Sequence, residues 1–199
     1  MKTKLLLFAT LSLFMTVALS AQEAKYEIKS AIITKSYEMM GQKHDVVHYF
    51  DNYGMLESSQ AKMSLQGLPG VTQNIRTITK GDTIIAVNMT TKMGNRMVLP
   101  EKPINYLKLT PEIREKYKIK ELEQEEVAGE MCKKYTVEVT QMGQTVNITT
   151  WIWKGIALKS ITQSGGMTVM TEASTKIQEN EAIDAEVFSI PDGITIQRM

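Results

Sequence analysis

A side-chain pattern with a period of two runs through most of this chain after its first 21 residues and limits the folds that it can adopt. Segments 26–30, 46–50 and 135–140 alternate with a period of two, and segment 145–153 is rich in Val, Ile, Thr and Trp. β-Branched and aromatic residues on this period favour strands with one buried face. We therefore expect a mainly β protein.

Short turn signals separate these segments at regular intervals. They are Gly41-Gln42, Asp51-Asn52-Tyr53-Gly54, Lys80-Gly81-Asp82, Gly94-Asn95, Gly143-Gln144, Lys154-Gly155 and Gly165-Gly166. Strands joined by such short connections form hairpins, so the sheet should be mainly antiparallel. The spacing predicts about ten strands.

One stretch, residues 100–126, interrupts the alternation. Thr110 is a suitable helix cap and Pro111 suits the first helical position. Ile113 and Tyr117 then lie four residues apart on one face. The sequence predicts a helix from about Pro111 to Lys118, between two β-rich halves.

The first 21 residues have the pattern of a secretory signal peptide. Lys2 and Lys4 precede an uncharged apolar stretch, 5–19, and small residues then allow cleavage after Ser20 or Ala21. The apolar stretch is shorter than the roughly 20 residues of a membrane span. No cysteine lies near the cleavage point, so a lipid-modified N-terminus is not expected.

Cleavage would leave residues 22–199, which we expect to form a single domain. Loss of Lys2 and Lys4 moves the formal net charge from +1 to −1, a balance that argues against a nucleic-acid partner. No second apolar segment reaches membrane length. We expect a periplasmic or secreted protein of a Gram-negative bacterium, without a stable membrane span.

The sequence offers little catalytic or metal-binding chemistry. His44 and His48 are the only histidines, and on a strand this spacing puts them about 13 Å apart, too far for one metal ion. We therefore interpret both as exposed strand residues. Cys132 is the only cysteine and is interpreted as a small buried strand residue. These observations predict a non-enzymatic protein with no catalytic residues, metal or cofactor.

Methionine is unusually frequent. The chain has 14 Met but only 4 Phe and 2 Trp. Met89, Met93 and Met97 are four apart and would share a face if they lay on one strand. Because the methionines are spread along the chain, a copper site is disfavoured. They either fill the core or line an adaptable apolar cavity.

Three stretches together carry a family resemblance. Glu126-Val-Ala-Gly-Glu-Met-Cys-Lys-Lys-Tyr135 precedes a strand, a Gly turn and Thr150-Trp-Ile-Trp153, and the chain closes with Phe188-Ser-Ile-Pro-Asp-Gly193. This order resembles a family of small secreted bacterial proteins of unknown activity. That family is related in pattern to the periplasmic lipoprotein carriers, the LolA-like and LolB-like proteins.

The resemblance implies a strongly curved antiparallel sheet, an incomplete β-barrel, with one or two helices on its concave side. In the carriers, an apolar cavity between sheet and helices holds acyl chains. This sequence departs from them in having one clear helix where they use several. The carriers also gate their lid with an arginine, whose counterpart among Arg76, Arg96 and Arg114 cannot be assigned.

Two functions remain open from the sequence. The first is a non-enzymatic envelope protein that binds a lipid or other apolar ligand, such as an acyl chain, in a half-barrel cavity. The alternative is a structural or protein-interaction module of the cell envelope with a filled core and an envelope protein as its partner. The expected cavity wall for the first function consists of Met89, Met93, Met97, Ile113, Tyr117, Trp151 and Trp153.

Overall fold

The computed structural model describes residues 23–39, 41–64, 72–141 and 144–198, so the expected signal peptide lies outside the described residues. The elements in chain order are β1 (Ala31–Met39), β2 (Gln42–Asp51), η1 (Asn52–Gly54), β3 (Leu56–Ser64), β4 (Thr72–Lys80), β5 (Thr83–Asn88), β6 (Met93–Val98), α1 (Pro111–Lys116), β7 (Lys120–Val127), β8 (Glu130–Gln141), β9 (Gln144–Trp153), β10 (Ile156–Ser164), β11 (Met167–Glu179), η2 (Ala185–Phe188) and β12 (Thr195–Arg198). Among these residues no helix has the length and apolar character that crossing a membrane requires.

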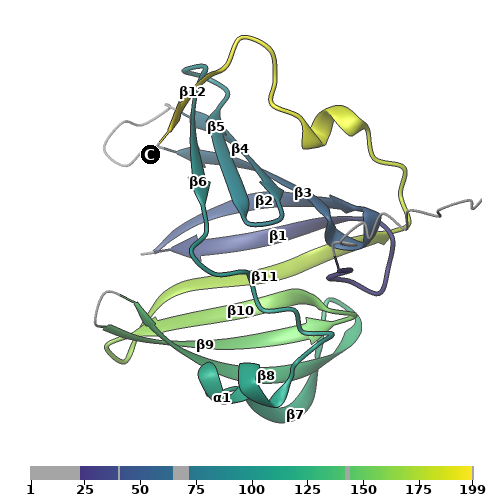
Figure 1. The fold of residues 1–199 in the computed structure, drawn as a ribbon, viewed down its shortest axis with the longest axis vertical. Coiled ribbons are helices and arrows are strands. Elements are labelled where there is room, and N and C mark those ends of the chain that lie inside the picture. Colours follow the sequence, from purple (N-terminus) through teal and green to yellow (C-terminus); the bar gives the residue numbers. More distant parts are fainter. Residues whose placement is uncertain (1–22, 40, 65–71, 142–143, 199) are drawn as a thin grey trace, which may run out of the picture.

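All the described strands belong to one open, curved sheet (Figure 1). Its order is β12-β6-β5-β4-β3-β2-β1-β11-β10-β9-β8-β7, and every pair is antiparallel except β12 with β6. The mainly antiparallel sheet is as predicted, but the described residues form twelve strands where about ten were expected. The parallel strand β12 pairs with a strand about one hundred residues earlier, so no local turn signal announces it.

Helix α1 begins where the sequence predicts. The Thr110 side chain accepts a hydrogen bond from the backbone N–H of Ile113 at 3.4 Å, and Pro111 occupies the first turn. The helix ends at Lys116, slightly earlier than expected, because the backbone turns at Lys118 with φ of 47°. That the concave side of the sheet carries the helix stays a prediction.

Two clusters of apolar side chains form the core. The first includes Ala31, Ile33, Phe50 and Leu158, none of which is exposed. The second lies under the helical region and consists of Ile119, Tyr135, Val137 and Ile152, with Ile104, Tyr106, Leu109, Ile113 and Tyr117 packed against them. The segment that connects the two β-rich halves is thus anchored on the sheet by its own apolar residues.

The turn after β2 supplies a test of how tightly the segment before β1 packs. Gly54 has φ of +83°, and a Cβ atom there would lie 2.5 Å from the Tyr26 ring, which itself packs on Phe50 with centroids 4.5 Å apart. Gly41 has a similar φ of +76°, but a Cβ there meets nothing within 4 Å.

We therefore expect Gly41→Ala to lower the free energy of unfolding by about 1 kcal/mol through backbone strain alone. Gly54→Ala should cost about 2 kcal/mol more, because overpacking adds to the same strain. Urea unfolding of both variants and the wild type measures the difference. Equal costs for the two variants would show that the Tyr26 ring yields freely.

Candidate functional site

The methionines lie outside the core. The described residues include nine of them: Met39, Met55, Met63, Met89, Met93, Met97, Met131, Met167 and Met170. None belongs to the buried core, and Met131 and Met167 are 59% and 70% exposed. For these residues the core-filling interpretation is wrong, and the large Met content has to be explained by the surface or by pockets.

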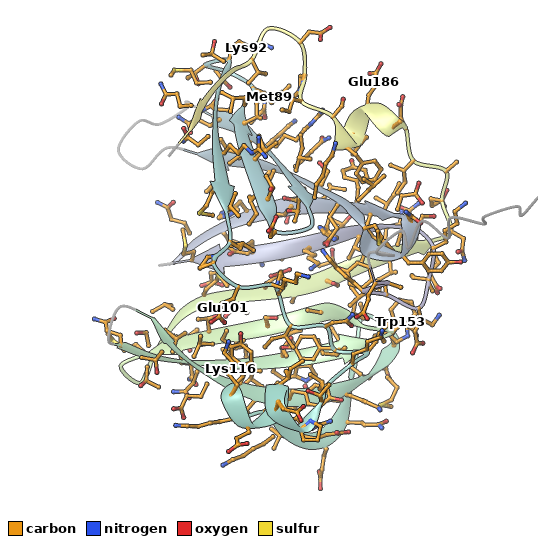
Figure 2. All side chains as sticks on the ribbon, viewed as in Figure 1. Met89, Lys92, Glu101, Lys116, Trp153 and Glu186 are labelled. Carbon is orange, nitrogen blue, oxygen red and sulfur yellow. The ribbon has the colours of Figure 1, made fainter. Side chains whose placement is uncertain are left out.

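The seven residues expected to form a cavity wall do not lie together. Met89 follows β5 in the turn before β6, so it does not share a strand with Met93 and Met97, as the spacing of four had suggested. Met93 and Met97 are both on β6 and are 45% and 46% exposed. Figure 2 shows Met89 near the top of the molecule and Trp153 at about mid-height on the right, well separated from it.

The remaining four wall residues lie in the two core clusters. Ile113 and Tyr117 pack in the cluster under α1, whereas Trp151 and Trp153 belong to the first cluster. The two tryptophans alternate with Ile152, and all three side chains are buried. Both faces of β9 are covered at this end of the strand, so burial of the tryptophans does not show which face is the concave one. A cavity wall shared by all seven residues therefore stays a prediction.

Among the described residues, pockets of two sizes lie in the β2–β6 half of the sheet, and the larger of these is the candidate site, which we call the Arg76 pocket. Its volume is about 560 Å³. The lining residues are Asp45, Val47, Gln60, Ala61, Lys62, Asn74, Ile75, Arg76 and Met89. Of the seven predicted wall residues, Met89 lines it.

Strand register builds the floor of this pocket. Val47 on β2 is directly paired with Gln60 on β3, and Gln60 is paired with Arg76 on β4. Directly paired residues project to the same side of a sheet, so these three side chains form a row. Met89 also lines the pocket, and its backbone N–H donates to the carbonyl of Asn74 at 2.8 Å, which holds this residue beside β4.

The pocket and helix α1 lie on opposite faces of the sheet. A row of direct pairs leads from Tyr135, which packs under α1, across the sheet to Tyr37 on β1 through Thr150, Ser160 and Glu172. Two residues before Tyr37 on the same face is Lys35, which pairs with Val46 on β2. Val47, the next residue, therefore points to the other face, as does the row that ends at Arg76.

Arg76 is the most unusual side chain in the pocket. Its Nη1 donates to the backbone carbonyl of Glu186, in η2, at 3.3 Å. Its Nε is buried, and no acceptor within the described part of the chain faces it. The sequence had marked Arg76 only as one of three candidates for a gating arginine, because nothing local distinguishes it from Arg96 or Arg114.

A smaller pocket, of about 340 Å³, lies on β4, β5, β6 and β12. Its lining includes Met93, Asn95 and Gln197. Met93 is thus a second predicted wall residue that lines a pocket. Both pockets use Ile75, which places them next to each other on the β2–β6 half.

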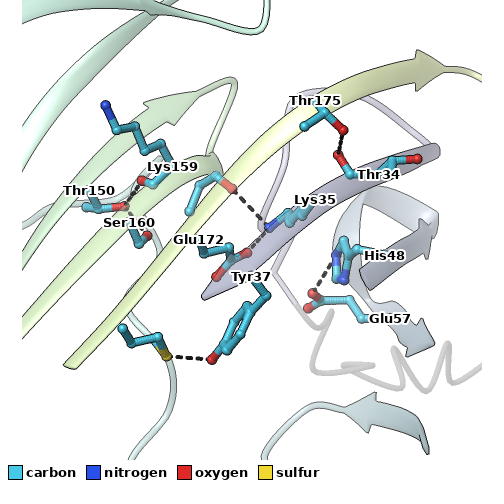
Figure 3. Close-up of polar contacts among 12 residues, drawn as sticks. Thr34, Lys35, Tyr37, His48, Glu57, Thr150, Lys159, Ser160, Glu172 and Thr175 are labelled. Carbon is cyan, nitrogen blue, oxygen red and sulfur yellow. Dashed lines mark hydrogen bonds and ion pairs between the residues drawn. The ribbon is translucent and has the colours of Figure 1, made fainter. Parts of the chain in front are cut away.

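A buried polar cluster occupies the middle of the sheet (Figure 3). Lys35 pairs with Glu172 at 2.5 Å and also donates to the carbonyl of Ala157 at 3.1 Å. Glu57 accepts from Lys25 at 2.5 Å and from the Tyr26 hydroxyl at 2.9 Å, and its carboxylate is 3.4 Å from His48 Nε2.

His48 is not the exposed strand residue that the sequence suggested, since only 18% of its side chain is exposed. Burial, and after it the charge of Lys35, lower the pKa of His48 to about 4, although Glu57 acts in the opposite direction. His48 is therefore neutral at pH 7. Among the described residues no three His, Cys, Asp or Glu side chains converge as a metal site.

Cys132 is fully buried, as predicted from its place in a strand. Burial, with a smaller effect from Glu130, raises the pKa of its thiol to about 11. A thiol with this pKa is almost wholly protonated at neutral pH and is a poor nucleophile.

Comparison with known proteins supports the fold. No protein-family model matches the chain, and no curated protein sequence does. Among solved structures, an uncharacterised conserved protein from Thermus thermophilus superposes with a TM-score of 0.59 at 8% identity, over 87% of this chain and 92% of that one. MucB in the Pseudomonas aeruginosa MucA/MucB complex superposes with a TM-score of 0.53 at 16% identity, over 88% of this chain.

The fold is LolA/LolB-like. The family resemblance drawn from the sequence is thus confirmed for the fold. A lipoprotein-sorting protein domain from Vibrio parahaemolyticus is a more distant match, with a TM-score of 0.41 at 12% identity over 83% of this chain and 92% of that one. The chain spans about three fifths of MucB, 60% of its length, and at these identities the LolA/LolB-like likeness concerns architecture alone.

The neutral state of His48 makes the LolA/LolB-like sheet sensitive to acid. The His48 imidazole binds a proton at about pH 6.5 in the unfolded chain but only near pH 4 in the folded protein. The free energy of unfolding is therefore not reduced by this group above about pH 6.5, and it declines as the pH falls toward 4. Between pH 7 and pH 5 we expect the free energy of unfolding to fall by about 2 kcal/mol from this group.

His48→Gln should remove most of that decline, because a neutral amide does not titrate. Chemical denaturation of the wild type and the variant at pH 7 and pH 5 measures the fall in the free energy of unfolding. The difference in this fall between the two proteins isolates the contribution of His48 from those of the charged groups around it, which are Lys35, Glu57, Glu172 and Lys25. Identical pH slopes for the two proteins would contradict the assignment.

Proposed function

We propose that this protein is a non-enzymatic binding protein of the bacterial cell envelope and that it holds an apolar or amphiphilic ligand in the Arg76 pocket. The observation that carries the proposal is a pocket of about 560 Å³, lined in part by Met89, in a protein whose described methionines all lie outside the core. Pockets for small ligands commonly have volumes of 300–1,000 Å³.

The lining suits a ligand with two chemically different ends. Val47, Ile75 and Met89 give apolar surface, and Gln60, Asn74 and Arg76 give polar groups on the same strands. Burial of apolar ligand surface contributes about 25 cal/mol per Å². Methionine suits such a site because its unbranched, polarisable side chain adapts to flexible chains.

The chemistry of the pocket favours binding over catalysis. Asp45 is the one carboxylate among the lining residues, and neither His48 nor Cys132 is among them. Efficient acid–base or nucleophilic catalysis generally needs a second, matched group within hydrogen-bond reach. The signal-peptide pattern supports a periplasmic or secreted location.

An envelope protein is the second candidate partner. MucB, which shares the fold, is solved in complex with MucA. Met131 and Met167 are large exposed apolar side chains outside the Arg76 pocket and would be available to such a partner.

Titration of delipidated protein with a fluorescent fatty acid tests the ligand proposal. We expect saturable binding by the wild type and a loss of roughly fivefold to tenfold in affinity for Met89→Ser, because that change removes apolar contact area worth about 1 kcal/mol. Met131→Ser is the matched control, since Met131 lies outside the Arg76 pocket, and it should bind as the wild type does.

Solvent extraction of protein purified from its native host, followed by mass spectrometry, identifies what the pocket carries. An enriched amphiphile in the wild-type extract, depleted in the Met89→Ser extract, is the expected result. Absence of any bound amphiphile together with no fluorescent binding would overturn the proposal and leave the protein-interaction alternative.

A further inference from the structure

We propose that the Arg76 pocket recognises an anionic head group, a carboxylate or a phosphate, and that Arg76 is the residue that holds it. This inference rests on the proposed function, because it adds a head-group specificity to an amphiphile-binding pocket. It assigns to Arg76 a role in ligand recognition, with Lys62 as an auxiliary cation at the same site.

The hydrogen bonds of Arg76 leave one edge of its guanidinium without a partner. Nη1 is occupied by the carbonyl of Glu186, at 3.3 Å. The Nε–H is buried and meets no acceptor within the described residues. Nε and Nη2 form the side of the guanidinium that binds two oxygens of one carboxylate or phosphate in parallel.

The weak anchoring of Arg76 allows this edge to reach a ligand. Within the described residues, the guanidinium is held by one long hydrogen bond, to the carbonyl of Glu186. A small rotation about the side chain turns Nε and Nη2 toward an anion in the pocket and satisfies a donor that is otherwise buried without an acceptor. A buried donor without a partner is destabilising, so an acceptor supplied by the ligand is favoured.

The other half-buried cations of this protein show a different pattern. Lys35 and Lys25 are each paired with a carboxylate, Glu172 and Glu57 respectively, at 2.5 Å. Arg76 has no ion pair within 4 Å in the described part of the chain. The central lysines are thus neutralised by carboxylates of the protein itself, whereas the Arg76 guanidinium is able to pair with an anion of a ligand.

The charge of the lining agrees with an anionic ligand. Arg76 and Lys62 contribute two positive charges and Asp45 one negative charge, and the described residues contain no ion pair among the three. The balance is one positive charge at a pocket of a chain that is otherwise close to neutral. An anionic head group neutralises that charge, while the apolar part of the ligand lies along Val47 and Met89.

Competition among three ligands with the same twelve-carbon chain tests the proposal. Dodecanoate, dodecyl phosphate and dodecanol are each used to displace a fluorescent fatty acid from the delipidated full-length mature protein. We expect at least one of the two anions to bind about tenfold or more tightly than dodecanol, as a charge-assisted bidentate pair provides. Preference for dodecanoate indicates a fatty acid and preference for dodecyl phosphate a phospholipid head group.

Arg76→Gln should lower the affinity for the preferred anion to that of dodecanol and leave the affinity for dodecanol unchanged. Arg76→Lys should restore part of the preference, and Lys62→Gln should weaken it without abolishing it. Arg96→Gln is the matched control, because Arg96 is exposed on β6 and does not line the pocket. Thermal unfolding shows whether each variant is folded. If Arg76→Gln is not folded, the loss of anion preference in Lys62→Gln supplies the test.

Equal affinities for all three ligands would overturn the head-group assignment and leave the proposed function intact. An anion preference that survives Arg76→Gln in a folded protein would also overturn it. No binding of any of the three would remove both proposals together.

Discussion

The continuous ladder of backbone hydrogen bonds from β12 to β7 is the constraint on which the rest of this structure depends. The twelve strands of the described residues share one sheet, and each residue in a ladder has its face fixed by its partner. A one-residue shift between β1 and β2 would put Val47 on the Lys35 face, and one between β3 and β4 would move Arg76 off the face of Gln60. The register therefore puts the polar cluster around His48 on one side and the Arg76 row on the other.

The part of this fold that can be predicted is the part determined by residues that are close together in the sequence. The period-two segments gave antiparallel strands, Thr110 and Pro111 gave the start of α1, and Cys132 was expected to be buried. Each depends on residues a few positions apart. β12 was not predictable in this way, because its partner β6 is far away in the chain and the four-residue strand has no hairpin turn.

The candidate site escaped prediction for the same reason. Met89, Met93 and Met97 have a spacing that fits one strand, but the chain turns between Met89 and Met93. His48 looks like a surface residue in sequence, but Glu57 on β3 lies 3.4 Å from its ring, and Lys25 from the segment before β1 pairs with that Glu57. Arg76 stands out only when β2, β3 and η2 surround it, which no window of sequence around residue 76 contains.

Two opposite ways of handling charge in this sheet bear on what the protein can do. The Lys35–Glu172 and Lys25–Glu57 pairs satisfy each other, and breaking either would leave a half-buried charge alone. Such pairs hold one arrangement of the strands, and because their charges already neutralise each other, they attract a charged ligand only weakly.

Within the described residues, Arg76 has a neutral carbonyl at one nitrogen and no acceptor at another. Because that residue lines an open pocket on the face opposite α1, a ligand can complete its hydrogen bonds without disturbing the cluster under the helix, which is filled by Ile113, Tyr117 and their neighbours. Binding on this face therefore does not require α1 to move.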